Sequence, residues 1–147
     1  MSHQVFAWNR RVTYADCTVG NHVYYSRYLD FMEEARGEFF RALGIPMARL
    51  CEEGFIFPVL EARMKYWAAA RYDDEIVIRV WFTALSRLKM EFSSEVLRKD
   101  GVLLVSGKTL HVCTDTQDKP RRMEPGLMAL LSPYLEAAKP ATAEESK

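Results

Sequence analysis

Between residues 26 and 44, apolar residues recur every three or four positions, at Tyr28, Phe31, Met32, Ala35, Phe39 and Leu43. This spacing is typical of one buried face of an α-helix. Ser26 is a candidate N-cap, and Gly44 before Ile45-Pro46 is a stop signal. We therefore predict an amphipathic helix between these two signals. A second, short helix is predicted over residues 47–53, ending at Gly54.

Most of the remaining chain alternates with a period of two, which is typical of β-strands. Strands are predicted over residues 5–14, 58–67, 75–83, 90–96 and 102–114, with Lys99-Asp100-Gly101 as a hairpin turn before the last. A C-terminal helix is predicted over residues 125 to about 138. The order is a strand, a helix and then four strands in a meander. It predicts an α+β fold in which a curled antiparallel sheet wraps one long central helix.

Composition narrows the class of protein. The 147 residues predict a single domain over residues 1–139, followed by a polar tail, 140–147, that we expect to be disordered. Lys plus Arg and Asp plus Glu balance at 20 each, so bulk charge gives no reason to expect nucleic acid. Three cysteines, Cys17, Cys51 and Cys113, form neither a closed disulfide set nor a zinc pattern. We therefore expect a cytoplasmic protein with no metal, and no apolar run is long enough for a membrane span.

Polar side chains gather around Gly20, immediately before the predicted helix: Asp16, Thr18, Asn21 and His22. A loop that leads into a helix N-terminus offers free backbone N–H groups and the positive end of the helix dipole. Those groups stabilise a developing oxyanion. The sequence therefore predicts a candidate catalytic site in this loop.

The same loop resembles the signature of the hotdog-fold thioesterases, roughly Tyr-x-Asp-x-Asp-x-x-Gly-x-Val-x-x-x-x-Tyr-Leu. Residues 14–29 here are YADCTVGNHVYYSRYL, with Glu-Glu-Ala-Arg at 33–36, and residues 65–74 resemble the family's exit from the second strand. The resemblance covers about residues 5–122 and is strongest to the 4-hydroxybenzoyl-CoA and short-chain acyl-CoA thioesterases. It implies hydrolysis of an acyl-CoA or acyl-carrier thioester, without a cofactor, by a homodimer or homotetramer with sites at the subunit interface.

The signature is altered at three positions. Thr18 replaces the second Asp, which is the nucleophile or general base in many members, and Tyr25 replaces a His common in the short-chain branch. Asn21 occupies the usual glycine position because Gly20 comes one residue early. Plant acyl-carrier-protein thioesterases resemble this chain in having a His where His22 stands, and enediyne-pathway thioesterases also lack the acid. Losing the Asp therefore does not exclude thioester hydrolysis.

Four polar residues of the loop each carry a functional and a structural interpretation. His22 is suited to general base catalysis near neutral pH, or it hydrogen-bonds the backbone of a tight loop. Asp16 is a candidate acid, or orients His22, or forms an Asx turn or helix cap. Thr18 is a candidate for holding the attacking water, or is a structural substitution. Asn21 binds the substrate carbonyl or supports a left-handed backbone.

Other candidates lie at the start of the helix and beyond it. By the resemblance, the backbone N–H of Tyr25 is the oxyanion donor, and Tyr24 beside it is a candidate substrate contact. Glu33 and Arg36 either form a solvated helix face or, as in hotdog dimers, lie beside the partner's loop. Glu61 is a candidate cleft residue on its strand.

We expect His111 to be a packed or surface histidine and Cys17 a small buried filler.

The overall activity has two alternatives. The alternatives are a non-catalytic acyl-CoA-binding hotdog protein and an enoyl-thioester hydratase. Basic residues are available for the phosphates of CoA at Arg63, Lys65, Arg71, Arg87, Lys89, Arg98, Lys108, Arg121 and Arg122.

Overall fold

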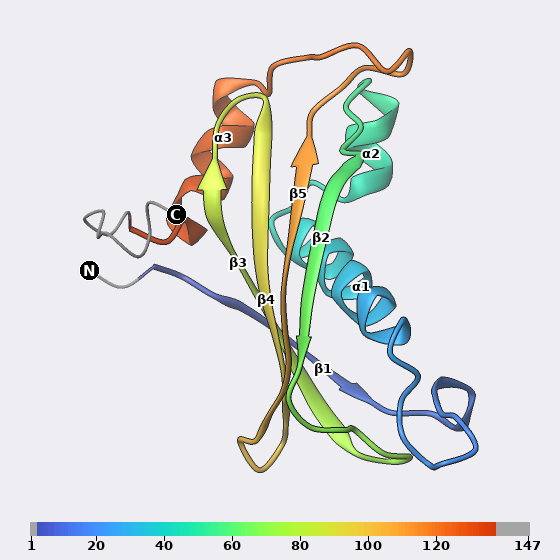
Figure 1. Ribbon diagram of the computed structural model, residues 1–147. Helices are drawn as coiled ribbons and strands as arrows, with labels where there is room; N and C mark the ends of the chain where they lie inside the picture. Colours follow the sequence, from blue (N-terminus) through green and yellow to red (C-terminus); the bar gives the residue numbers. More distant parts are fainter. Residues whose placement is uncertain (1–2, 138–147) are drawn as a thin grey trace, which may run out of the picture.

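The computed structural model describes residues 3–137 and shows a five-stranded antiparallel sheet with helices packed against it (Figure 1). In chain order, its elements are β1 (Phe6–Arg11), η1 (Tyr14–Asp16), α1 (Arg27–Ala42), α2 (Met47–Glu52), β2 (Val59–Tyr66), β3 (Glu75–Leu85), β4 (Lys89–Arg98), β5 (Leu103–Val112), α3 (Pro125–Leu131) and η2 (Ser132–Tyr134). All five predicted strands and all three predicted helices are present. The predicted tail, 140–147, lies outside the described residues.

The order of strands in the sheet is β1-β3-β4-β5-β2, so the predicted four-strand meander is wrong. Only β3, β4 and β5 follow one another as hairpins, while β2 pairs with β5 at the far edge. The reason is the connection over residues 67–74, which is too long for a tight hairpin. It runs to the end of β1, where the Asp73 N–H donates to Val12 O at 3.0 Å and the Val12 N–H donates to Asp74 O at 2.9 Å.

Helix α1 lies on one face of the sheet, and its predicted apolar face is buried (Figure 1). Phe39 packs edge-on against Phe82 of β3 and Phe92 of β4, with ring centroids 5.9 and 6.3 Å apart. Burying these rings supplies much of the hydrophobic free energy of the core. The predicted limits are confirmed within a residue, and Gly44 has the left-handed φ of +81° expected of a helix stop.

The C-terminal helix is shorter than predicted. Helix α3 ends at Leu131, and a single 3₁₀ turn over Ser132–Tyr134 follows it. Pro133 has no backbone N–H and cannot continue the α-helical hydrogen bonding, so the extension to residue 138 was wrong.

Strand β2 is an exposed edge of the sheet. Within the described part of the chain it pairs with β5 alone, and seven of its eight residues are exposed; Leu60, for example, retains 55% of its accessible surface. Gly107 of β5 lies opposite Met64, and a Cβ at Gly107 would stand 2.5 Å from Met64 Sδ and 3.2 Å from Met32 Cε of α1. The absent side chain therefore lets β2 and α1 close over the inner face of β5.

Candidate functional site

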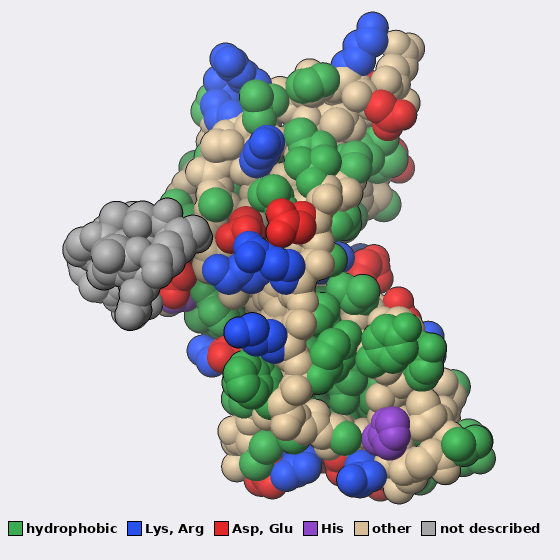
Figure 2. Space-filling view, in the orientation of Figure 1, with side chains coloured by type: hydrophobic (Ala, Val, Ile, Leu, Met, Phe, Trp, Pro, Cys, Tyr) green, Lys and Arg blue, Asp and Glu red, His purple; other side chains and the backbone are tan. Residues whose placement is uncertain are grey.

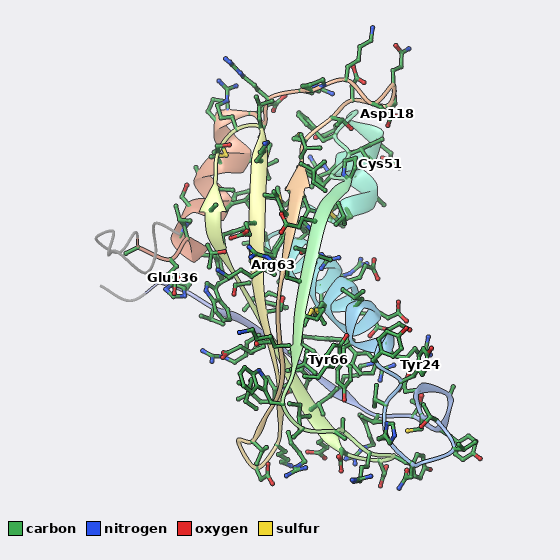
Figure 3. The ribbon with its side chains drawn as sticks, viewed as in Figure 1. Tyr24, Cys51, Arg63, Tyr66, Asp118 and Glu136 are labelled. Carbon is green, nitrogen blue, oxygen red and sulfur yellow. The ribbon has the colours of Figure 1, made fainter. Side chains whose placement is uncertain are left out.

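A pocket of about 430 Å³ lies between the loop before α1, the start of that helix and the end of β2. Its polar side chains are Thr18 and His22, and its aromatic walls are Tyr24, Tyr25, Tyr28, Tyr66 and Trp67. Figure 3 shows Tyr66 at the end of β2 and Tyr24 on the neighbouring loop, on the same side of the molecule. Among residues 3–137, no Asp, Glu, Lys or Arg lines this pocket, so His22 is the lining group suited to proton transfer near neutral pH.

The loop is closed on itself by backbone hydrogen bonds. The Thr18 N–H donates to His22 O at 2.9 Å, and the Asn21 N–H donates to Thr18 O at 3.0 Å. Cys17 and Val23 bridge at its base. Asn21 has a φ of +55°, a left-handed conformation that Asn tolerates better than most residues, and this fits the structural interpretation of Asn21.

Gly20 stands between Thr18 and His22 in the chain, and both of their side chains approach it. A Cβ built on Gly20 would stand 3.1 Å from His22 Nε2 and 3.8 Å from Thr18 Oγ1. The Gly20 N–H donates to Thr18 Oγ1 at 3.3 Å, so this hydroxyl is held within the loop. Among the described residues the imidazole makes one long polar contact, 3.5 Å from Nδ1 to Val23 O, so its Nε2 is left without a protein partner there.

The backbone N–H of Tyr25 is available as a hydrogen-bond donor. Within residues 3–137 it donates to no other group, and Tyr25 directly precedes Ser26, the N-cap residue of α1. Ser26 makes no side-chain cap within the described residues, and Tyr24, Tyr25 and Tyr28, around the N-terminal end of α1, line the pocket. The Tyr66 hydroxyl donates to Tyr25 O at 3.1 Å and ties this position to β2.

Asp16 lies outside the pocket, buried among hydrogen-bond donors. Arg10 binds both of its carboxylate oxygens, at 2.6 and 3.2 Å, and Arg27 donates at 3.2 Å. The backbone N–H and hydroxyl of Thr13 add bonds of 2.8 and 2.9 Å. Burial alone raises the pKa of Asp16, but the hydrogen bonds from Arg10 and Thr13 hold that pKa below its usual range. A carboxylate so fully bound is a weak base, which favours the structural interpretation.

Four other predicted site residues also lie outside the pocket. Asn21 faces the connection after β2, where its Oδ1 accepts from the Tyr72 N–H at 3.3 Å. Glu61 pairs with Arg63 at 3.1 Å on an exposed strand. Glu33 and Arg36 line a second cavity of about 280 Å³, between α1 and the start of β2.

Arg36 is the unusual group of this second cavity. Its Nη1 is buried with no hydrogen-bond partner among residues 3–137, and burial lowers the pKa of Arg36, with Glu33 opposing that shift. His111 beside it is bonded from Nδ1 to Phe57 O at 3.0 Å and from Nε2 to Thr109 Oγ1 at 2.9 Å. Burial lowers the pKa of His111, so the ring is neutral near pH 7. Of the two expected alternatives, a packed or a surface histidine, the structure shows the packed one.

Sequence reasoning missed two aromatic residues of the pocket wall, Tyr66 and Trp67. Tyr28, predicted on the buried helix face, also lines the pocket, and its hydroxyl accepts from the Ala70 N–H at 3.0 Å. Tyr66 and Trp67 close an alternating strand and precede three alanines. Bulky aromatic residues followed by small ones at a strand end are a signal that could have indicated a pocket.

Two other features, a metal-binding cluster and a membrane-spanning helix, were also sought in the described residues. Across residues 3–137, no three His, Cys, Asp or Glu side chains are arranged to hold a metal ion. No helix in that range is long and apolar enough to cross a membrane.

Comparison with known proteins gives consistent results. A model of the thioesterase-like superfamily matches residues 12–131. The acyl-CoA thioester hydrolase YbgC of Escherichia coli O6:H1 is 31% identical over 130 residues, 88% of this chain and 97% of that protein. A hypothetical protein from Aquifex aeolicus superposes with a TM-score of 0.81 at 28% identity, covering 86% of this chain and 98% of that one. A 1,4-dihydroxy-2-naphthoyl-CoA thioesterase from Synechocystis also gives a TM-score of 0.81, at 20% identity, covering 88% and 96%; this shows a shared fold.

Proposed function

The chain belongs to the thioesterase-like superfamily, whose reaction is thioester hydrolysis, and we propose that it hydrolyses an acyl-CoA ester in the pocket beside His22. The observation that carries the proposal is that one pocket combines the largely free imidazole of His22 with a Tyr25 N–H that has no acceptor within residues 3–137. A thiolate is a good leaving group, so an activated water and one oxyanion donor meet the main demands of the reaction.

In the proposed mechanism, His22 accepts a proton from water while the water oxygen bonds to the thioester carbonyl carbon. The carbonyl oxygen becomes an oxyanion that the Tyr25 N–H stabilises, and the Thr18 hydroxyl positions the water. The C–S bond then breaks as the C=O bond re-forms, and the thiolate takes the proton held by His22. The products are the free acid and the thiol, and His22 returns to its starting form.

We assign Asp16 a positioning role. Its bonds to Arg10 and Thr13 join β1 to the turn that begins the loop, and its bond to Arg27 joins the first residue of α1. Thr18 then occupies the family's acid position without supplying a base, and His22 takes over proton transfer.

We further propose that β2 pairs with β2 of a second copy, to give a homodimer or a homotetramer of dimers. An exposed eight-residue edge strand is a template for pairing with another chain. The three free cysteines, Cys17, Cys51 and Cys113, suit the cytoplasm. In this arrangement, α1 is the central helix of the hotdog fold.

Antiparallel pairing of two β2 strands would bring different pockets together. Val59 borders the Arg36 cavity and Tyr66 borders the His22 pocket, at opposite ends of β2. They lie about 23 Å apart along one strand. A two-fold axis at the middle of β2 would place the Arg36 cavity of one chain beside the His22 pocket of the other. Glu33 and Arg36 would then face the partner's substrate, and Arg36 would gain a partner for its buried nitrogen.

The test is release of thiol from acetyl, medium-chain, long-chain and aromatic acyl-CoA esters by wild type, His22→Ala and His3→Ala. We expect turnover of at least one ester class, lost in His22→Ala and retained in the control His3→Ala. Turnover that survives His22→Ala would overturn the assignment of the base but not the activity. Acyl-carrier esters of the same acids show whether CoA is required.

Thr18 at the acid position also favours a second candidate, a non-catalytic acyl-CoA-binding protein. That protein would bind CoA esters tightly and release no thiol from any of them. A hydratase would instead consume the enoyl absorbance without releasing thiol.

A further inference from the structure

The Arg36 cavity, of about 280 Å³, combines an apolar lining with one buried positive charge. Its apolar side chains come from α1, α2, the start of β2 and β4: Phe40, Met47, Phe57, Val59, Met90 and Phe92. Phe40 and Phe57 stack with ring centroids 6.3 Å apart, and His111 stands edge-on to Phe92 at 5.6 Å. The cavity is smaller than the sites of drug-sized ligands, so it suits a compact apolar group.

Arg36 is a charged member of this lining that no carboxylate neutralises. Within residues 3–137 its buried Nη1 has no hydrogen-bond partner, and the side chain forms no ion pair. Its Cζ lies 5.7 Å from the centroid of the Phe92 ring, on the wall of the cavity. Burial lowers the pKa of Arg36, yet a guanidinium stays charged at neutral pH. A buried charge without a partner is costly, and a bound anion would relieve that cost.

Several charged side chains on the sheet are paired, unlike Arg36. Figure 2 shows acidic and basic side chains gathered together at the middle of one face of the molecule. Two ion pairs of the sheet, Arg79–Glu95 and Arg63–Glu61, measure 2.9 and 3.1 Å. Water solvates such exposed groups, so their pairing contributes little. An unpaired cation shielded from water has no such substitute and calls for a counter-ion.

The polar neighbours of Arg36 do not supply the missing acceptor. The Nδ1–H of His111 donates to Phe57 O at 3.0 Å, and Nε2 accepts from the Thr109 hydroxyl at 2.9 Å, so both ring nitrogens are engaged. Glu33, one turn earlier on α1, is exposed and forms no ion pair with Arg36. The acceptor for Nη1 therefore has to come from a ligand or from a second chain.

We propose that the Arg36 cavity binds a carboxylate carried on a small apolar body, with the carboxylate on Arg36 and the body among the aromatic rings. Two sources have this chemistry. One is a free carboxylic acid. The other is the far end of the acyl group, when the substrate is a monothioester of a dicarboxylic acid and reaches from the His22 pocket of the partner in the proposed dimer. The second source rests on the proposed function, whereas binding of a free acid does not.

Binding of hexanoate tests the cavity without turnover, and hexanamide is an uncharged probe of the same shape. Arg36→Met removes the charge and keeps an apolar stem, while Arg41→Met removes an exposed arginine of the same helix. By NMR titration, we expect wild type and Arg41→Met to bind hexanoate with a Kd of about 1 mM or lower. Hexanamide on wild type, and hexanoate on Arg36→Met, should bind about tenfold more weakly, because each lacks one member of the charged pair.

Two further results separate a ligand from a second chain as the partner of Arg36. Glu33→Gln removes a negative charge near the guanidinium, so we expect it to bind hexanoate about two- to threefold more tightly. Arg36→Met should unfold in urea no more easily than wild type, because it removes an unpaired buried charge. A less stable Arg36→Met, or one that loses the dimer, would assign Arg36 to a carboxylate of the second chain and overturn the proposal.

Thioesters of matched length identify the source of the carboxylate. Turnover of adipyl-CoA is compared with hexanoyl-CoA, and suberyl-CoA with octanoyl-CoA. If the acyl group reaches the cavity, the ratio of kcat/KM for diacid over monoacid ester falls about tenfold in Arg36→Met and not in Arg41→Met. An unchanged ratio, with hexanoate binding that depends on Arg36, supports the free acid as ligand.

The two measurements also separate the failure of this inference from failure of the proposed activity. If neither hexanoate binding nor the diacid ratio depends on Arg36, the cavity is not a carboxylate site. If no ester is turned over, the proposed function fails, and hexanoate binding alone then decides whether the cavity holds a carboxylate.

Discussion

The imidazole of His22 packs over the backbone of Gly20, and a Cβ at Gly20 would stand 3.1 Å from His22 Nε2. The position of the proposed base therefore depends on a residue that has no side chain. Gly20 does not adopt a positive φ, so its role is to leave space for the ring.

Gly20→Ala should therefore impair catalysis more than folding. The added methyl group displaces the imidazole by a few tenths of an ångström or more, and we expect kcat to fall about 10- to 100-fold. The free energy of unfolding should stay close to that of wild type, since the backbone conformation suits alanine. Thiol release measures the change in kcat, and urea unfolding measures the free energy of unfolding. Gly126→Ala, where an added Cβ meets nothing within 4 Å, is the matched control.

Removing the Tyr25 N–H should abolish most of the activity. Tyr25→Pro eliminates this donor, and loss of one oxyanion donor lowers kcat about 100- to 1000-fold. Tyr25→Phe keeps the N–H and should retain most of the turnover, because the proposed role is main-chain. Circular dichroism verifies that both variants are folded. Equal activity of the two variants would contradict the role of this N–H.

Asp16→Asn should reduce stability far more than catalysis. It leaves Arg10 without its buried counter-ion, and breaking a buried pair costs about 3 kcal/mol. At a temperature where the variant stays folded, we expect kcat within about fivefold of wild type. A general base would contribute 100-fold or more, so a collapse of kcat in folded protein would return Asp16 to the mechanism.

The contribution of Asp16 to stability should vanish in acid. Its pKa is lowered in the folded protein relative to about 3.9 in the unfolded chain. The bound carboxylate thus stabilises the fold fully above the unfolded pKa, and this contribution is lost as pH falls through the lower folded pKa. The difference in unfolding free energy between wild type and Asp16→Asn, measured in urea at pH 7 and below pH 3, should shrink at low pH. A constant difference would refute the linkage.

Gly107→Ala should destabilise the protein without affecting the His22 loop directly. The new Cβ would stand 2.5 Å from Met64 Sδ and 3.0 Å from the Arg63 carbonyl oxygen, so β2 must shift. We expect a loss of about 1–3 kcal/mol, as for overpacking elsewhere. The control is Gly37→Ala, where a Cβ meets nothing within 4 Å and which should be neutral or stabilising. Chemical unfolding of both variants measures these changes in the free energy of unfolding.

Local sequence patterns predicted the helices and strands, but they did not predict which strands pair in the sheet. The period of α1 and the stop at Gly44 depend on neighbours in the chain, so both could be read from the sequence. The pairing of β2 with β5 depends on contacts between residues about 45 positions apart in the chain. The alternating pattern of β2 does not indicate which strand it pairs with.

The same distinction between local and distant residues holds for the candidate site. Thr18, His22, Tyr24 and Tyr25 lie in one loop and were predicted together, and the structure places all four on one pocket. The partners of Asp16 and the far wall formed by Tyr66 and Trp67 come from other elements, which a single sequence does not align. The catalytic roles of these residues remain predictions.

The pairing of β2 with β5 also sets an order of assembly. During synthesis, residues 59–66 leave the ribosome long before residues 103–112, so β2 has no strand to join until most of the chain exists. Contacts between distant segments form slowly because the intervening loop must first close. Tyr66 and Trp67 reach the loop of His22 only when that closure is complete. The pocket is therefore among the last parts of the molecule to form, and a chain that ends before residue 103 cannot build it.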